Sequence, residues 1–236
     1  MKWVWGALLV LIAVPAQAQG LEDLGASISS QTLQLIALLT VLSLAPGIAV
    51  MITCFPFIVT VLSILRQAIG LQQAPPNMLI ISLALFLTYY VMEPVFAAAW
   101  SAGIADIIDG TVPLEQGLNL ASGPFRTFMI GRLDPDTFFA LADLRSDVPT
   151  SVTPDTAPFS VIVPSFMLSE IARAFQIGFL VFLPFLIIDL VVSAVLMSMG
   201  MMMVPPAMVS LPFKLAFFVV ADGWSLIAGS LVRSYF

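Results

Sequence analysis

The chain has 236 residues, of which 60% are hydrophobic and only 9% are charged, whereas a soluble domain carries about 25% charged residues. This composition excludes an ordinary soluble domain and indicates a membrane protein, or a subunit whose apolar flanks are covered by partners. The formal net charge is −6, but the acidic residues are clustered, so this value describes no single region of the chain. Histidine is absent. The single cysteine, Cys54, cannot form an internal disulfide and is interpreted as a small apolar filler.

Residues 1–18 are typical of a signal peptide. A basic Lys2 precedes the apolar run WVWGALLVLIAV, and the sequence AQA at 16–18 matches the small-residue pattern of a cleavage site. We therefore expect cleavage near Ala18 and Gln19. The alternative is a first transmembrane helix, but the apolar run is shorter than the ~20 residues that a span needs, and a proline ends it.

Residues 19–100 are predicted to form a first apolar helical hairpin. The uncharged stretch 33–65 is interrupted by proline twice, which indicates either one long kinked helix or a short hairpin. The turn sequence LQQAPPN, with Pro75 and Pro76, separates this stretch from a second apolar helix over 78–92, which we expect to continue to about Trp100.

Residues 101–162 differ in kind and are predicted to be a small external domain on the periplasmic side. Between residues 101 and 160, eight acidic residues accompany three arginines. Short helices are expected over 113–130 and 134–145, followed by a linker at 148–158. Two of the acids, Asp106 and Asp109, have the spacing of paired carboxylates, but in an acidic loop region we interpret them as solvated surface residues.

Residues 163–236 are predicted to be a second apolar hairpin. One helix is expected over about 165–199, bent near Pro184, and another over about 207–232, after Pro205 and Pro206. With a cleaved signal peptide and four spans, both hairpin tips face the cytoplasm; the few basic residues constrain this orientation only weakly. The fold class is therefore an all-α integral membrane protein with about four apolar helices in two kinked hairpins.

The two predicted hairpin tips share a spaced motif. Glycine, a proline pair and methionine recur at identical intervals in 70–78 and in 200–208. This match is either a chance result in a proline-rich apolar chain or the trace of an internal repeat, and repeats are common in membrane transport folds.

Charged residues inside the apolar segments carry a functional signal, because such residues are costly in a membrane, usually face protein and usually pair. Glu170 and Arg173 are three residues apart and can pair on one helix. Lys214 has Asp222 as its nearest acid, two turns away, and so needs a partner elsewhere. We expect Glu170 and Lys214 to make contacts between subunits; the alternative is that these charges lie at the membrane interface, with Lys214 snorkelling. The full set is Glu93, Glu170, Arg173, Asp189, Lys214 and Asp222.

The methionines Met201, Met202 and Met203 follow one another directly. Gap filling in a core explains one or two flexible methionines, but successive helical residues lie about 100° apart and cannot share one buried stripe. In a short loop, three methionines can form a deformable apolar collar. Repeated around a ring of subunits, that collar is a seal, and hydrophobic constrictions gate pores.

The sequence indicates no enzyme. It has no histidine, no CxxC motif, no phosphate-binding loop and no nucleophile–base pair. We expect no cofactor, no bound metal and no nucleic-acid partner.

Beyond these patterns, the chain resembles the FliP family, a core subunit of the flagellar type III protein export gate, over nearly all of its mature length. The stretch 163–175, VPSFMLSEIARAF, is similar to the entry of the family's third helix. Three longer stretches carry the rest of the resemblance: LSILRQAIGLQQAPPNMLIISLALFLTYYVMEPV (62–95), PFRTFMIGRLDPDTFFALADL (124–144) and FQIGFLVFLPFLIIDLVVSAVLMSMGMMMVPPAMVSLPFKLAFFVVADGWSLIAGSL (175–231).

The resemblance implies a function and a set of partners. Members of the family form a ring of several copies with FliQ- and FliR-like membrane subunits, and the ring passes unfolded flagellar subunits across the bacterial inner membrane at the flagellar basal body. FlhA- and FlhB-like export components and membrane lipids are the further expected partners. The resemblance also implies that Met201, Met202 and Met203 form the pore gasket and that Glu170 and Lys214 lie between neighbouring subunits.

Three alternatives stay open at this point. The same subunit of a virulence (injectisome) type III secretion system differs in system rather than in mechanism. A small-solute transporter fits the broken helices and buried charges, although no dense polar cluster at mid-depth supports one. A membrane-anchored assembly factor would act through the external domain and would not need the methionine loop.

Overall fold

The computed structural model describes residues 32, 35–36, 39–40, 43–44, 46–71, 75–149 and 152–236. Contacts divide the chain into two compact units, Met1–Ala49 and Val50–Phe236. The described residues of the first unit are helical, and Thr40 Oγ1 donates to the carbonyl of Ile36 at 2.8 Å. The predicted signal peptide, with cleavage near Ala18 and Gln19, lies outside the described residues.

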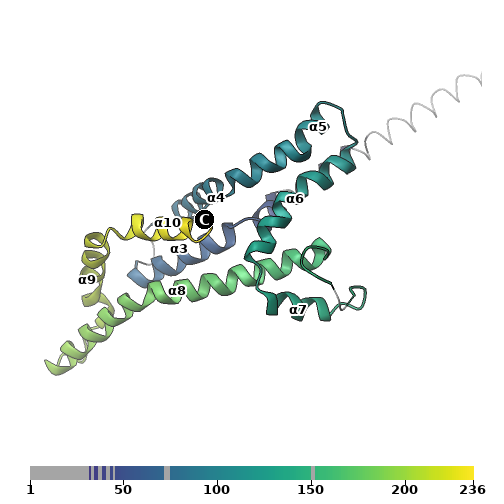
Figure 1. The fold of residues 1–236 in the computed structure, drawn as a ribbon. Coiled ribbons are helices and arrows are strands. Elements are labelled where there is room, and N and C mark those ends of the chain that lie inside the picture. The colour runs from purple at the N-terminus through teal and green to yellow at the C-terminus, as the bar shows by residue number, and fades with distance from the viewer. Residues whose placement is uncertain are drawn as a thin grey trace, which may run out of the picture. The chain divides into compact units, whose positions relative to one another are not determined.

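The second unit is built from helices, and its described residues contain no strand, which confirms the predicted all-α class (Figure 1). The helices expected over 113–130 and 134–145 are α6 and α7. The elements in chain order are α3 (Phe55–Ile69), α4 (Asn77–Ala99), the π-helix η1 (Trp100–Ile104), α5 (Ala105–Ile108), α6 (Leu114–Arg132), α7 (Pro135–Asp143), α8 (Phe159–Ser198), α9 (Pro206–Val220) and α10 (Gly223–Arg233).

Helix α3 forms the centre of the larger core. Pro56 lies in its first turn, where a proline needs no hydrogen-bond partner for its nitrogen. More than half of its residues are buried, and it packs against α4 and α8. With 15 residues it is about 22 Å long, shorter than the ~30 Å hydrocarbon core of a bilayer. The predicted first hairpin therefore contributes a buried core helix as well as a long apolar one.

A glycine lets α3 and α8 approach closely. A Cβ atom at Gly178 would lie 2.4 Å from Cδ1 of Ile64, which is closer than two carbon atoms can pack. Residues from the two predicted hairpins are thus in direct contact, and the hairpins share one core rather than forming separate layers.

A second core joins the segment between the apolar regions to the start of α8. It includes Met129 of α6, Phe138 of α7, and Ile162 and Phe166 of α8. Helix α7 begins with a capping residue, because the backbone N–H of Thr137 donates to the Asp134 carboxylate at 3.0 Å. Helix α8 begins at Phe159, so it crosses the predicted domain boundary at 162, and α4, η1 and α5 together cross the boundary at 100.

The apolar helices differ in whether they are long enough to cross a membrane. Within the described residues, Asn77–Ile108 and Phe159–Ser198 are each long and apolar enough to cross a bilayer. Helices α9 and α10 meet the same criteria only as a pair, and the pair is bent by 61°. In the described part of the chain, α4, α8 and the α9–α10 pair correspond to three of the predicted apolar helices, and α3 to the end of the predicted stretch 33–65; two or three of these have the length of a span.

The two predicted hairpin tips have the same backbone conformation at their glycines. Gly70 after α3 and Gly200 after α8 have φ angles of +88° and +74°, a left-handed conformation that glycine adopts without steric conflict. Pro76 precedes the first residue of α4, and Pro205 precedes the first residue of α9. The spaced motif therefore corresponds to two helix ends and two helix starts of the same kind.

Candidate functional site

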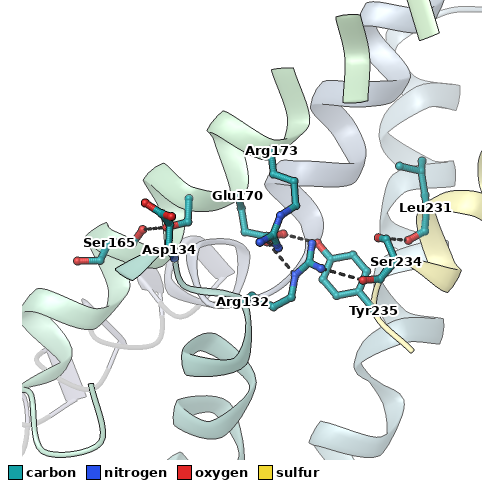
Figure 2. Close-up of polar contacts among 9 residues, drawn as sticks. Arg132, Asp134, Ser165, Glu170, Arg173, Leu231, Ser234 and Tyr235 are labelled. Atoms are coloured by element: carbon teal, nitrogen blue, oxygen red, sulfur yellow. Dashed lines mark hydrogen bonds and ion pairs between the residues drawn. The ribbon is translucent and has the colours of Figure 1, made fainter. Parts of the chain in front are cut away.

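Glu170 is a fully buried acid. It lies on α8, and its Oε1 accepts from Arg132 Nε of α6 at 3.0 Å and from Arg173 Nη1 at 3.4 Å. Its second oxygen, Oε2, accepts from the hydroxyl of Tyr235. The carboxylate has three partners from three parts of the chain, which offsets the cost of removing its charge from water (Figure 2).

Arg132 links this acid to the end of α10. Its Nη1 donates to the backbone carbonyl of Ser234 at 2.8 Å, and its guanidinium carbon lies 4.1 Å from the centre of the Tyr235 ring. The Tyr235 ring also packs edge-on against Phe57 of α3. We call Arg132, Glu170, Arg173, Ser234 and Tyr235 the Glu170 cluster; it ties α6, α8 and the residues after α10 together.

Lys214 forms the second buried charge centre. Its Nζ donates to Asp189 Oδ2 at 2.6 Å and to the carbonyl of Ala68 at 3.1 Å. Asp189 also accepts from Ser210 Oγ at 2.6 Å. Because Ala68 is in the last turn of α3, the cation also meets the negative end of a helix dipole. We call Lys214, Asp189, Ser210 and the Ala68 carbonyl the Lys214 cluster; it joins α3, α8 and α9.

The predicted pair of Glu170 and Arg173 is present, and Lys214 does have a distant partner, but that partner is Asp189. Asp189, one of the charges in the apolar segments, is paired with Ser210 and Lys214 within the chain. The role of Glu170 and Lys214 in contacts between subunits stays a prediction. Each side chain is buried and paired inside a single chain.

Sequence reasoning missed Arg132 and Tyr235. Arg132 lies in the acidic middle segment, where we interpreted charges as solvated, and Tyr235 lies beyond the last predicted helix. The usable signal in the sequence is that Glu170 lies in an apolar segment, where a charged residue usually faces protein and pairs. Only folding brings residues 38 and 65 positions away from Glu170 into contact with it.

The methionine loop follows α8 directly. Met201, Met202 and Met203 are 41%, 85% and 96% exposed. The loop is held by backbone hydrogen bonds, from Met201 N–H to the Leu196 carbonyl at 3.0 Å and from Val204 N–H to the Met201 carbonyl at 3.3 Å. Backbone contacts thus help to hold the loop, and the side chains of Met202 and Met203 are exposed to another molecule.

Catalytic chemistry has no recognisable centre in the part of the chain that the structure describes. No group of three or more Cys, Asp or Glu residues in that part could hold a metal ion. The polar groups that converge are ion pairs between helices, and such pairs fix helix positions rather than polarise a substrate.

The long apolar helices and the ion pairs between them thus define an all-helical protein with transmembrane character. Residues 38–231 match the FliP family model, and the chain belongs to this family. Similar proteins named flagellar biosynthetic protein FliP occur in Caulobacter vibrioides, with 54% identity over 89% of this chain and 79% of the relative. Others occur in Agrobacterium fabrum, with 44% identity over 97% of both chains, and in Bacillus subtilis, with 45% identity over 87% of this chain and 93% of the relative. Membership of the family makes the chain a component of the flagellar export apparatus.

Proposed function

We propose that the chain is a pore-forming core subunit of the flagellar protein export gate. Several copies assemble as a ring in the bacterial inner membrane, and the ring passes unfolded flagellar subunits out of the cytoplasm. FliQ- and FliR-like subunits complete the ring, and FlhA- and FlhB-like components deliver substrates to it. The acidic segment with α6 and α7 lies on the periplasmic side.

The observation that carries the proposal is the exposed apolar surface of α8. Large hydrophobic side chains remain exposed from Leu168 to Met197, a distance of about 44 Å along a helix. The hydrocarbon core of a bilayer is only ~30 Å thick. Lipid alone therefore cannot cover this surface unless the helix is strongly tilted, and neighbouring protein subunits are the natural cover for the remainder.

The methionine loop supports a pore rather than a solid assembly. Three adjacent methionines are exposed in the single chain, and backbone hydrogen bonds help to hold the loop that carries them. In a ring, each copy would contribute one loop to a shared constriction. Methionine is flexible and polarisable, so such a constriction can close around itself and still deform around a passing chain.

A permeability measurement tests the collar. Changing Met201, Met202 and Met203 to alanine shortens the side chains in the constriction, and we expect cells that carry the assembled variant gate to leak small ions or dyes. A matched control replaces three exposed methionines near the loop, Met197, Met199 and Met208, and should leave the seal intact. Unchanged permeability in an assembled gate with the loop variant would contradict the gasket role.

A further inference from the structure

The last two helices form an arm with a bend at Asp222. Helices α9 and α10 together have the length and composition of one span, yet they are bent by 61°. Asp222 has φ 47° and ψ 49°, and it is the one non-glycine residue with a positive φ in the described part of the chain. In this conformation the Cβ of an L-residue crowds its own backbone. The bend is therefore held against a local steric preference.

The residues on either side of the bend are in close contact. A Cβ atom at Gly223 would lie 2.1 Å from Cε2 of Phe218, so the ring of Phe218 fills the place of a side chain. Trp224 packs edge-on against the same ring at 5.3 Å between centroids. These contacts exist only while α10 is folded back, so they mark a defined state rather than a loose joint.

The far end of the arm is fastened by the Glu170 cluster. The Tyr235 hydroxyl donates to Glu170, and the Ser234 carbonyl accepts from Arg132. The Tyr235 ring adds contacts with Phe57 and Phe128, at 5.6 and 6.0 Å between ring centres. Figure 2 shows the Tyr235 ring beside Arg132, with its hydroxyl toward Glu170. Among the described residues, these two hydrogen bonds are the polar contacts that join this end of the arm to α6 and α8.

Between the bend and the fastening, α10 is less closely packed against α8. A cavity of about 350 Å³ reaches from the bend, where Gly223 lines it, along α8 and α10, where Leu180 and Leu226 line it. A smaller cavity of about 120 Å³ lies beside Val61 and Ser230. Ile227 and Leu231 carry the buried side chains of α10, and Gly223 at its start is also buried. Packing along α10 is thus incomplete. The contacts at the bend and the contacts of Ser234 and Tyr235 hold the helix in its folded position.

We propose that α9 and α10 are a latched arm with two states: folded back, as described above, and straightened into one continuous apolar helix. The hinge is Asp222 and the latch is Tyr235 with its partners Glu170 and Arg132. The steric preference of Asp222 favours the straight state, and the latch favours the folded state. When the latch opens, Glu170 loses its Tyr235 partner and becomes accessible from that side.

Spin labels on either side of the larger cavity test the two states. The full chain carries Cys54→Ala, to remove the native thiol, with Leu180→Cys and Leu226→Cys, two exposed positions on α8 and α10. Double electron–electron resonance in lipid nanodiscs then reads the distance between the labels. We expect one narrow short distance, and in the Tyr235→Phe variant, which keeps the ring but loses the hydroxyl, a second and longer distance. Tyr90→Phe, at an exposed tyrosine of α4, is the matched control and should change nothing.

Substitutions at Asp222 should shift the balance between the folded and the straight state in opposite directions. Asp222→Gly removes the steric conflict and also disfavours a continuous helix, so it should suppress the long-distance population of Tyr235→Phe. Asp222→Ala makes the left-handed conformation worse and the helix better, so it should open the arm with the latch intact. Identical distance distributions in Tyr235→Phe, Asp222→Ala and the parent would show that packing alone fixes α10 and would overturn the proposal. A variant that opens without rescue by Asp222→Gly would exclude Asp222 as the hinge.

Discussion

The Glu170 cluster and the Lys214 cluster both bury a charge between apolar helices, but they differ in the number of partners. Glu170 receives hydrogen bonds from two arginines and a tyrosine, whereas Lys214 has one acid, Asp189, and one backbone carbonyl within the described residues. The more exposed members are alike: the side chain of Arg173 is 36% exposed and that of Asp189 is 32% exposed. The first cluster is redundant and the second is not.

This difference predicts how strongly the loss of one partner should destabilise each cluster. Removing one partner of a buried ion pair is strongly destabilising, because the remaining charge stays buried without compensation. Lys214 loses its one described acidic partner when Asp189 is removed, whereas Glu170 keeps two of its three partners when any one of them is removed. The first cluster can therefore lose a contact, as in the proposed latch, while its helices stay in place.

The largest effect is expected at Asp189. Asp189→Ala leaves the Lys214 ammonium with the Ala68 carbonyl as its described partner, and we expect a loss of about 3–5 kcal/mol in the free energy of unfolding. Thermal unfolding of the detergent-solubilised chain measures it. Asp189→Ala with Lys214→Met removes both charges and should recover most of the loss; a double variant as unstable as the single one would show that charge pairing is not the cause.

The identity of Lys214's partner can be tested by exchanging charges. Lys214→Glu places two acids together, and adding Asp189→Lys should restore part of the thermal stability. Adding Glu170→Lys instead should not, since it sets a third cation beside Arg132 and Arg173. If Glu170→Lys rescued ring assembly on a native gel while Asp189→Lys did not, Lys214 would meet Glu170 between subunits rather than Asp189 within one.

Within the Glu170 cluster, the two arginines should differ. Arg132→Ala removes the ion pair and the bond to the Ser234 carbonyl, and hydrogen bonds to charged groups are worth about 1.5–3 kcal/mol each. Arg173→Ala removes a longer contact from a partly exposed side chain, where ion pairs contribute about 0–1 kcal/mol. Equal losses of thermal stability in the two variants would contradict a cluster organised around Arg132.

The smallest effect concerns the cap of α7, which lies outside both clusters. The hydroxyl and backbone N–H of Thr137 donate to Asp134 and hold the pKa of that carboxyl below its ordinary value. A depressed pKa means that the cap stabilises α7 above about pH 4, the unfolded pKa, and that this stability is lost as pH falls through the folded pKa. Asp134→Ala should therefore lower the melting temperature slightly at neutral pH and converge with the parent in acid, with Asp134→Asn as the uncharged control. A constant difference across pH would exclude the carboxylate as the cause.

Much of the fold followed from the sequence. Apolar runs, prolines and the charge-rich segment predicted the helical class, α6, α7 and the positions of both tips, because these features depend on local composition and backbone restrictions. Gly70 and Gly200 repeat at the same interval from a proline pair, and they share one conformation. Span lengths were harder to predict, since hydropathy does not distinguish a buried core helix such as α3 from a membrane helix.

The candidate sites were predictable only in part. Local spacing predicted the contact of Glu170 with Arg173, and three adjacent methionines predicted a loop. The contacts of Arg132 and Tyr235 with Glu170, and of Asp189 with Lys214, join residues of different helices, and one chain's sequence contains no distance between helices. The bend at Asp222 was also missed, because aspartate adopts a left-handed conformation too rarely to be expected there.

The central claim is that the chain functions as one of several copies in a ring. Native mass spectrometry after detergent extraction, with the neighbouring FliQ- and FliR-like subunits co-expressed, tests it most directly. The account predicts a discrete complex that contains several copies of this chain together with those subunits. A stable monomer or dimer that does not bind them would contradict the ring, remove the methionine collar and favour a transporter formed by a single chain.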